Sequence, residues 1–132
     1  MLKAIKIDSN NSARNPIIQD LARKAHNGFS SEFVFVRNDV EVAFLCYDNN
    51  PRYSSGFIYE IYVICEFRKQ GLGSEILAYV ESLAKKDGKS AIRLEPRAFD
   101  RTLDEGVLIA WYTRKGYSWA TDDPKKMEKQ LG

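Results

Sequence analysis

Residues 57–64, with the sequence FIYEIYVI, constrain the fold more than any other segment, because Glu60 is their only charged residue. The β-branched and aromatic side chains that dominate the segment are typical of an extended strand. A strand that is apolar on both faces lies inside a sheet whose two faces are both covered. The segment therefore predicts a central strand, with helices packed on each side of its sheet.

The rest of the chain predicts further strands and helices. The dipeptide Asn38-Asp39 separates two apolar runs, 32–37 and 40–47, which indicates a β-hairpin. Asn15 and Pro16 suit the N-cap and the first position of a helix. The predicted order is a strand at 3–7, a helix from Pro16 to a stop signal at Asn27-Gly28, strands at 32–37, 40–47 and 57–64, a helix at 72–87, a strand at 91–95, a helix that ends at Arg114–Gly116, and strands at 117–120 and 125–131. This order predicts an α/β protein with a mixed sheet.

Apolar residues at helical spacing predict which face of each helix is buried. Thr102 and Glu105 have the spacing of a capping box at the start of the last helix. The predicted buried positions are Ile17, Ile18, Leu21, Ala22 and Ala25 in the first helix, Leu72, Ile76, Val80 and Leu83 in the second, and Leu103, Val107, Ala110 and Trp111 in the third.

Length and composition exclude several classes of protein. The 132 residues fit a single domain over 1–132, and a net charge of +2 provides no general basic surface for nucleic acid or anionic lipid. Two cysteines and one histidine are too few for a disulfide framework or a His/Cys zinc site, so we expect no metal. No apolar run approaches the roughly 20 residues of a membrane span, and the N-terminus lacks a signal-peptide core. We therefore expect a cytoplasmic protein, with neither membrane nor nucleic acid as a partner.

The segment Arg68–Ser74, RKQGLGS, lies between the central strand and the longest predicted helix. Glycines at such a junction let backbone N–H groups point inward, and the helix N-terminus adds unpaired donors, so the loop suits a phosphate or pyrophosphate. The alternative is a tight turn in which Gly71 and Gly73 only relieve crowding. The segment lacks the Gly-Lys-Ser/Thr end of a P-loop and has one glycine too few for a dinucleotide fingerprint.

The loop matches the pattern Arg/Gln-x-x-Gly-x-Gly/Ala, and it follows the sequence V-x-x-E-F-R that begins at Val63. A second motif, Tyr112-x-x-x-Gly116-Tyr117, lies after the next strand. In these motifs and in the order of elements, residues 57–117 resemble the GNAT superfamily of acyl-CoA-dependent N-acetyltransferases. Cys65 stands where that superfamily usually has proline.

The resemblance implies an acyl-CoA N-acyltransferase fold, with a mixed, mostly antiparallel sheet of about six to seven strands and helices on both faces. It also implies acetyl-CoA as cosubstrate, with direct transfer of the acetyl group to a primary amine and backbone N–H groups near Val63 stabilising the oxyanion. The residues implied in cofactor binding are Tyr62 and Val63 for the pantetheine arm and Arg68, Lys69, Gln70, Gly71, Leu72, Gly73 and Ser74 for the pyrophosphate.

Two catalytic roles are predicted. The resemblance implies that Tyr112 protonates the departing thiolate; its place beside Leu108 favours exposure to a cleft, and the alternative is a tyrosine that only packs a helix on the sheet. Glu60 is the leading candidate for the base that accepts the amine proton, because burial raises the pKa of a carboxyl group toward neutrality. Glu95 and water are the other candidates for the base, and a salt bridge from Glu60 to Arg93 is the structural alternative.

The sequence leaves the acceptor open between a protein lysine or N-terminus and a small-molecule amine. It also leaves open whether the protein is a monomer or a homodimer. The rival function is a catalytically silent acyl-CoA-binding module that acts through protein contacts of the charged segment 97–106.

Overall fold

The computed structural model describes residues 2–25, 29–96 and 104–132, and its order of elements confirms the prediction. None of the helices in these ranges is both long enough and apolar enough to cross a bilayer. The elements are β1 (Leu2–Lys6), α1 (Pro16–Ala25), β2 (Ser30–Arg37), β3 (Val40–Asp48), β4 (Ser55–Val63), a 3₁₀ turn η1 (Cys65–Phe67), α2 (Leu72–Lys86), β5 (Ala91–Leu94), α3 (Glu105–Arg114), β6 (Ser118–Trp119) and β7 (Met127–Gln130).

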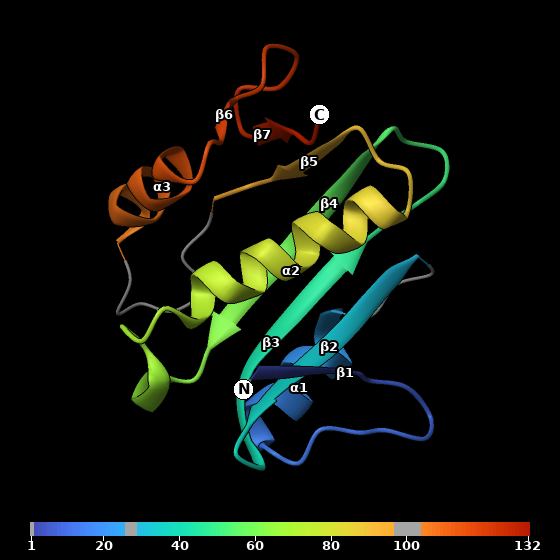
Figure 1. Ribbon diagram of the computed structural model, residues 1–132, viewed down its shortest axis with the longest axis vertical. Helices are drawn as coiled ribbons and strands as arrows, with labels where there is room; N and C mark the ends of the chain where they lie inside the picture. The colour runs from blue at the N-terminus through green and yellow to red at the C-terminus, as the bar shows by residue number, and fades with distance from the viewer. Residues whose placement is uncertain (1, 26–28, 97–103) are drawn as a thin grey trace.

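The described strands form one seven-stranded sheet in the order β1-β2-β3-β4-β5-β7-β6. β4 and β5 pair in parallel, and every other neighbouring pair is antiparallel. Figure 1 shows α2 in front of the sheet and α1 behind it. The mixed, mostly antiparallel sheet with helices on both faces is therefore confirmed, and β4 lies at its centre as the apolar segment 57–64 predicts.

The two faces of the sheet bury two separate apolar clusters. Side chains from α2, from Tyr112 of α3 and from the facing side of the strands form the larger cluster, which we call the α2-side core. Side chains from α1 and from the opposite side of β2 and β3 form the smaller, α1-side core. The sheet is thus the middle layer of a three-layer domain, and β4 contributes side chains to both cores: Ile58, Ile61 and Val63 to the α2-side core and Tyr62 to the α1-side core.

A β-bulge changes the alternation of side chains along β4. Glu60 lies opposite Cys46 of β3, but the next residue of β3, Tyr47, lies opposite Ile58, so Tyr59 is an extra residue in β4. Ile58 and Ile61 consequently both face the α2-side core, although three positions separate them. Glu60 shares the opposite, α1 face with Cys46.

The predicted buried face of the last helix is wrong at Val107 and Ala110, although Trp111 does pack against the α2-side core. Val107 is 63% exposed, Ala110 is also exposed, and the helix buries Tyr112 instead. The predicted capping box is wrong as well, because the N-cap is Asp104, whose carboxylate accepts hydrogen bonds from the N–H groups of Gly106 and Val107. Thr102 and Leu103 lie outside the described residues.

The other helices follow their predicted faces closely. Leu72, Ile76 and Val80 of α2 are fully buried, whereas Leu83 is partly buried. In α1, Ile18 is buried, but the neighbouring Ile17 is 48% exposed and does not belong to the buried face.

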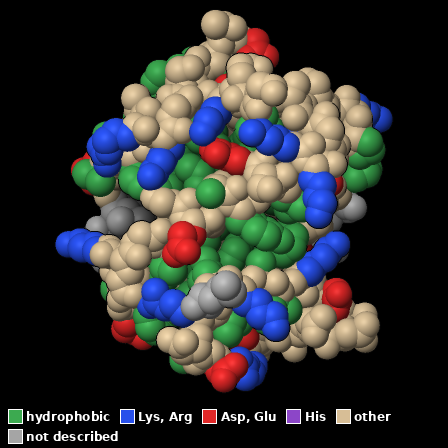
Figure 2. All heavy atoms as spheres, in the orientation of Figure 1, with side chains coloured by type: hydrophobic (Ala, Val, Ile, Leu, Met, Phe, Trp, Pro, Cys, Tyr) green, Lys and Arg blue, Asp and Glu red, His purple; other side chains and the backbone are tan. Residues whose placement is uncertain are grey.

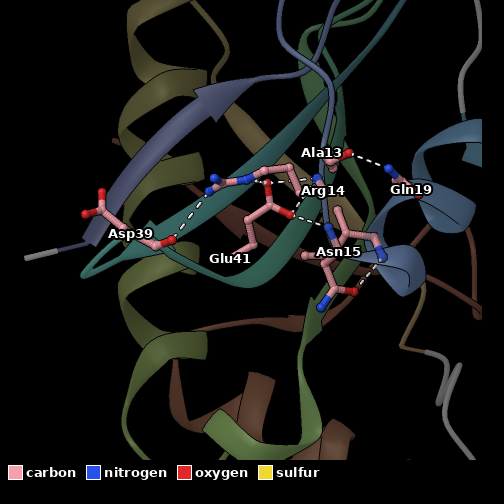
Figure 3. Close-up of polar contacts among 7 residues, drawn as sticks. Ala13, Arg14, Asn15, Gln19, Asp39 and Glu41 are labelled. Atoms are coloured by element: carbon pink, nitrogen blue, oxygen red, sulfur yellow. Dashed lines mark hydrogen bonds and ion pairs between the residues drawn. The ribbon is translucent and has the colours of Figure 1, made fainter.

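A buried carboxylate from β3 fixes the start of α1. Glu41 accepts hydrogen bonds from the backbone N–H groups of Arg14, at 2.8 and 3.0 Å, and Asn15, at 2.6 Å. Asn15 is the N-cap that the sequence predicts, since its side-chain oxygen accepts from the N–H groups of Ile17 and Ile18. Figure 3 shows the carboxylate of Glu41 turned toward this turn of backbone. The position of α1 on its face of the sheet therefore depends on one side chain of β3.

We expect Glu41→Gln to destabilise the protein by about 1 to 3 kcal/mol, because an amide cannot accept all the charge-assisted hydrogen bonds that the carboxylate accepts. The measurement is urea denaturation followed by circular dichroism. Glu66→Gln, an exposed position with no hydrogen bond or ion pair among the described residues, is the matched control. Equal stabilities of the two variants would show that Glu41 does not anchor α1.

Candidate active site

β4 and β5 separate halfway along β4. Their pairing ends at Ile58 and Leu94, whereas β4 continues to Val63. Figure 1 shows the two strands diverging beyond this point. In an antiparallel pair, the backbone groups of every second residue form hydrogen bonds to the partner strand. Directly after β4, the Ile64 N–H donates to Val42 O of β3, so Ile64 and Tyr62 face β3. The backbone groups of Ile61 and Val63 therefore point to the opposite edge of β4, into the opening.

Arg68 closes part of this edge. Its Nε donates to the backbone oxygen of Val63 at 2.9 Å, and its guanidinium carbon lies 5.3 Å from the centre of the Tyr62 ring. The cation–π contact and the hydrogen bond hold a positive charge beside the end of β4. The predicted cofactor residues Tyr62, Val63 and Arg68 are thus neighbours.

The glycine loop has the backbone geometry of a strained strand-to-helix turn. Lys69 and Gly71 have φ angles of 64° and 79°, in the left-handed region. A Cβ atom on Gly71 would meet nothing within 4 Å, so the backbone angle and not crowding requires glycine there. At Gly73 a Cβ atom would lie 3.4 Å from the Trp111 ring, which is an ordinary van der Waals contact, so crowding does not require glycine at this position either.

The N-terminus of α2 carries no side-chain cap. Gly71 is its N-cap residue, and the first helical bond runs from Glu75 N–H to Gly71 O at 3.2 Å. The N–H groups of Leu72, Gly73 and Ser74 precede this bond and have no acceptor within the helix. A helix of 15 residues with three such donors and its positive dipole end attracts an anion.

The side chains of Leu72, Lys69 and Gln70 in the glycine loop differ in burial. The side chain of Leu72 is buried in the α2-side core, so only its backbone faces the loop. Lys69 and Gln70 are exposed, and Gln70 accepts a hydrogen bond from Arg37. On the face that carries α2, Figure 2 shows Lys and Arg side chains around a central apolar region, with Asp and Glu side chains among them.

Glu60 is a buried carboxyl group that forms no ion pair with any residue that the structure describes. It is 8% exposed, and its Oε2 atom has no hydrogen-bond partner among the described residues. Burial raises the pKa of Glu60 from 4.5 to about 7. The alternative of a salt bridge with Arg93 is wrong, because Arg93 pairs with Glu128 at 2.9 Å and with Asp122 at 2.8 Å.

A pocket of about 820 Å³ reaches Glu60 from the α1 side. Glu95, the second candidate base, lines the same pocket, so the structure brings both predicted carboxyl groups to one place. The lining residues are Leu21, Lys24 and Ala25 of α1, Asp48, Asn50 and Tyr53 at the end of β3 and beyond it, Ser55, Phe57, Ile58, Tyr59 and Glu60 of β4, Arg93 and Glu95 of β5 and the residues that follow it, and Lys126.

Tyr112 lies in the α2-side core and does not line this pocket. It is 6% exposed, and its ring packs edge-on against Trp111 and Tyr117, with centroids 4.9 and 5.6 Å away. The predicted exposure of Tyr112 to a cleft is therefore wrong, and burial raises the pKa of its phenol above the ordinary value. Ile61 and Val63 pack against the same core, on the opposite side of β4 from Glu60.

Sequence reasoning missed the pocket wall opposite α1. The predicted strand at 40–47 stops one residue short of Asp48, which is the last residue of β3 and lines the pocket with Tyr53 and Tyr59. Lys89 is buried and donates to the backbone oxygens of Asn50 and Tyr53, at 2.8 and 2.7 Å, which holds this loop in place. A lysine directly after a C-terminal helix glycine gives no signal of such a role.

Comparison with known proteins identifies the family. A family model described as the acetyltransferase (GNAT) family matches residues 4–117. The chain belongs to the GNAT acetyltransferase family. The match includes β4, the glycine loop and Tyr112, and it also covers most of the N-terminal third, where the sequence carries no diagnostic motif. No curated protein matches the chain significantly.

Solved structures of other GNAT proteins share the fold at low sequence identity. The ribosomal-protein-S18-alanine N-acetyltransferase from Escherichia coli has a TM-score of 0.71 and 16% identity, with 100% of this chain and 95% of that enzyme covered. A GNAT family acetyltransferase from Elizabethkingia anophelis with acetyl-CoA bound has a TM-score of 0.69 and 11% identity, with coverage of 98% and 97%. The PaiA N-acetyltransferase from Thermoplasma acidophilum in complex with coenzyme A has a TM-score of 0.62 and 17% identity, with coverage of 86% and 69%.

The raised pKa of Glu60 makes stability depend on pH. A carboxyl group whose pKa is higher in the folded state destabilises that state when it ionises, so the cost is absent below about pH 4 and complete above about pH 7. We expect Glu60→Gln to gain up to about 3 kcal/mol of unfolding free energy relative to the parent between pH 4 and pH 8. Urea denaturation at both pH values measures the difference.

The exposed variant Glu66→Gln is again the control, and we expect it to stay within about 0.5 kcal/mol of the parent at both pH values. A stability difference for Glu60→Gln that does not change with pH would contradict burial as the cause of the raised pKa.

Proposed function

We propose that the protein is an N-acetyltransferase that moves an acetyl group from acetyl-CoA directly to a primary amine. One observation carries the proposal: the unpaired edge of β4 runs from the uncapped N-terminus of α2 to the buried carboxyl group of Glu60. Family membership supports acetyl transfer, and the GNAT structures with bound coenzyme A or acetyl-CoA support the cosubstrate.

The chain offers a binding group for each part of acetyl-CoA. The N–H groups of Leu72, Gly73 and Ser74 and the guanidinium of Arg68 suit the pyrophosphate. The exposed Lys69 adds a further positive charge, and Gln70 lies beside it. The backbone groups of Ile61 and Val63 suit the amides of the pantetheine arm, which would add to β4 where β5 no longer does.

The reaction requires a base for the amine and an acid for the thiolate. Glu60 accepts a proton from the acceptor ammonium, directly or through water, and the amine nitrogen then forms a bond to the thioester carbon. Backbone N–H groups near Val63 stabilise the oxyanion, the C–S bond breaks, and Tyr112 donates its proton to the leaving sulfur. The nitrogen loses its second proton to water as the amide forms, and the phenolate of Tyr112 regains a proton from water. Glu60 and Tyr112 belong to opposite sides of β4, so the acid and the base approach the opening from different directions.

Several finer assignments stay predictions. Glu95 or water could take the role of the base, since Glu95 lines the pocket with Glu60. The cytoplasmic location and a monomeric or homodimeric state also stay predictions from the sequence. The charged segment 97–106, on which the rival binding-module function depends, lies mostly outside the described residues.

We expect Gly71→Asp to abolish stabilisation by acetyl-CoA, because its carboxylate would repel the phosphates. For the parent, acetyl-CoA at 100 times its Kd should add about 2.7 kcal/mol, seen as a rise of several degrees in Tm. Gly88→Asp is the matched control: Gly88 has the same φ of 79° and the same open surroundings, but lies at the other end of α2. Equal shifts of Tm with acetyl-CoA in both variants would place the pyrophosphate elsewhere.

We expect Tyr112→Phe to lower kcat by about 10² to 10⁴-fold, because general acid catalysis contributes that much and only the hydroxyl is lost. Acetyl-CoA binding, measured by the shift in Tm, should be unchanged, and the defect should be the same for amines of different basicity. Tyr79→Phe, which removes a hydroxyl from another tyrosine of the α2-side core, is the control and should keep full turnover. A defect that follows the basicity of the amine would contradict the role of Tyr112.

A thiol-release assay with acetyl-CoA and a panel of amines, including peptides, tests the function as a whole. Turnover on any amine supports the transferase. Binding of acetyl-CoA without turnover on any of them would contradict it and favour the rival binding module.

A further inference from the structure

The positive charges around the Glu60 pocket are already neutralised by carboxylates that do not line it. Three cationic side chains line the pocket: Arg93, Lys24 and Lys126. Arg93 is the most buried of the three, and it donates from Nε to Glu128 and from both terminal nitrogens to Asp122. Neither Glu128 nor Asp122 faces the pocket. The Arg93 guanidinium is therefore paired with carboxylates of β7 and of the loop before it, and it contributes little net positive charge to the cavity.

The other two cations, Lys24 and Lys126, also form ion pairs with carboxylates outside the pocket. Lys24 of α1 pairs at 3.0 Å with Asp20 one turn earlier, a carboxylate that also pairs with Arg23, and the Lys24 side chain is 70% exposed to solvent. Lys126 pairs with Asp123 at 3.5 Å, and its Nζ lies 5.4 Å from the centre of the Phe57 ring. Neither of these two carboxylates lines the pocket.

Two carboxyl groups inside the pocket have no such partner. Glu60 is more than nine-tenths buried and has an orphaned oxygen, and among the described residues neither Glu60 nor Asp48 forms an ion pair. Asp48 is held in place: its Oδ1 accepts from Asn50 N–H at 2.7 Å, and its Oδ2 accepts from the Tyr59 hydroxyl at 3.4 Å. The pocket therefore contains two uncompensated acids, one of them preorganised at its outer wall.

The register places both acids on one face of the sheet. Glu60 lies opposite Cys46, and Asp48 is two residues beyond Cys46 on the same face of β3. Two residues along a strand and one strand spacing across give a Cα separation of about 8 Å. Both side chains line the same pocket beneath α1.

Aromatic rings form part of the wall around these acids. Phe57 and Tyr59 lie with ring centroids 4.8 Å apart, and Tyr53 lies on the loop that Lys89 fastens by two hydrogen bonds. Aromatic faces next to carboxylates attract organic cations with apolar methylene chains. A negatively charged aryl-rich pocket of this kind repels anionic acceptors and favours those with more than one positive charge.

From this arrangement we infer that the acceptor is a small aliphatic diamine, whose reacting amine lies at Glu60 and whose second ammonium group binds Asp48. The inference rests on the proposed acetyl transfer and names the substrate class for the same site. A four-carbon chain in its extended form separates two nitrogens by roughly 6 Å, which suits two carboxylates about 8 Å apart at their Cα atoms. The aromatic wall would cover the methylene groups between the two nitrogens.

The test compares 1,4-diaminobutane with n-butylamine, which has the same chain and the same reacting group but no second ammonium. We expect the kcat/KM of the diamine to exceed that of the monoamine by about 10 to 100-fold in the parent. Asp48→Asn should lower this ratio to near one, whereas Asp48→Glu, which keeps the charge, should retain part of it. Asp39→Asn, in the exposed β2–β3 turn, removes the same charge far from the pocket and should leave the ratio unchanged.

The outcomes separate the two claims. Equal use of both amines by the parent, or turnover confined to peptide amines, would overturn the diamine inference while the transferase stands. A preference for the diamine that survives Asp48→Asn, in a variant whose circular dichroism and Tm shift with acetyl-CoA match the parent, would overturn the assignment of Asp48. No thiol release with any amine would reject the proposed function itself.

Discussion

The structure depends on a backbone constraint at the middle of the sheet. Buried N–H and C=O groups need hydrogen-bond partners, yet β4 loses its partner β5 after Ile58 and continues to Val63. Arg68 supplies a partner for one of these groups, the backbone oxygen of Val63. The others face an opening in which an extended, amide-containing ligand could pair with β4. The glycine loop follows this edge in the sequence, and the pocket reaches Glu60, where the edge begins.

The bulge at Tyr59 gives the opening its chemical asymmetry. Without the extra residue, Glu60 would have the same parity as Ile58 and would point into the α2-side core. With it, the carboxyl group turns to the α1 side, where burial raises its pKa to about 7 and where it lines the pocket. Tyr112 remains on the other side. One inserted residue thus separates the proposed acid from the proposed base.

The sequence predicts the features that local patterns encode. The central strand, the hairpin turn with φ angles of 53° and 63° at Asn38 and Asp39, and the loop before α2 all follow from residue type and spacing. The bulge could not be predicted, because β4 is apolar on both faces and a slip in its alternation leaves no trace in the pattern. The buried face of α3 was mistaken since Val107 and Tyr112 are both hydrophobic, and only packing against Tyr117 decides between them. The place of Asp48 in the pocket could not be predicted, because its hydrogen-bond partners come from the turn after β3 and from the neighbouring strand.

The central claim is that acetyl-CoA lies along the unpaired edge of β4 with its phosphates at the N-terminus of α2. Amide chemical shifts of the ¹⁵N-labelled protein, recorded during titration with acetyl-CoA, test this claim most directly. We expect the largest changes at the N–H groups of Ile61, Val63, Gly73 and Ser74, and small changes at β1 on the far edge of the sheet. Saturable binding that leaves Val63 and Ser74 unperturbed and shifts other amides instead would contradict the account.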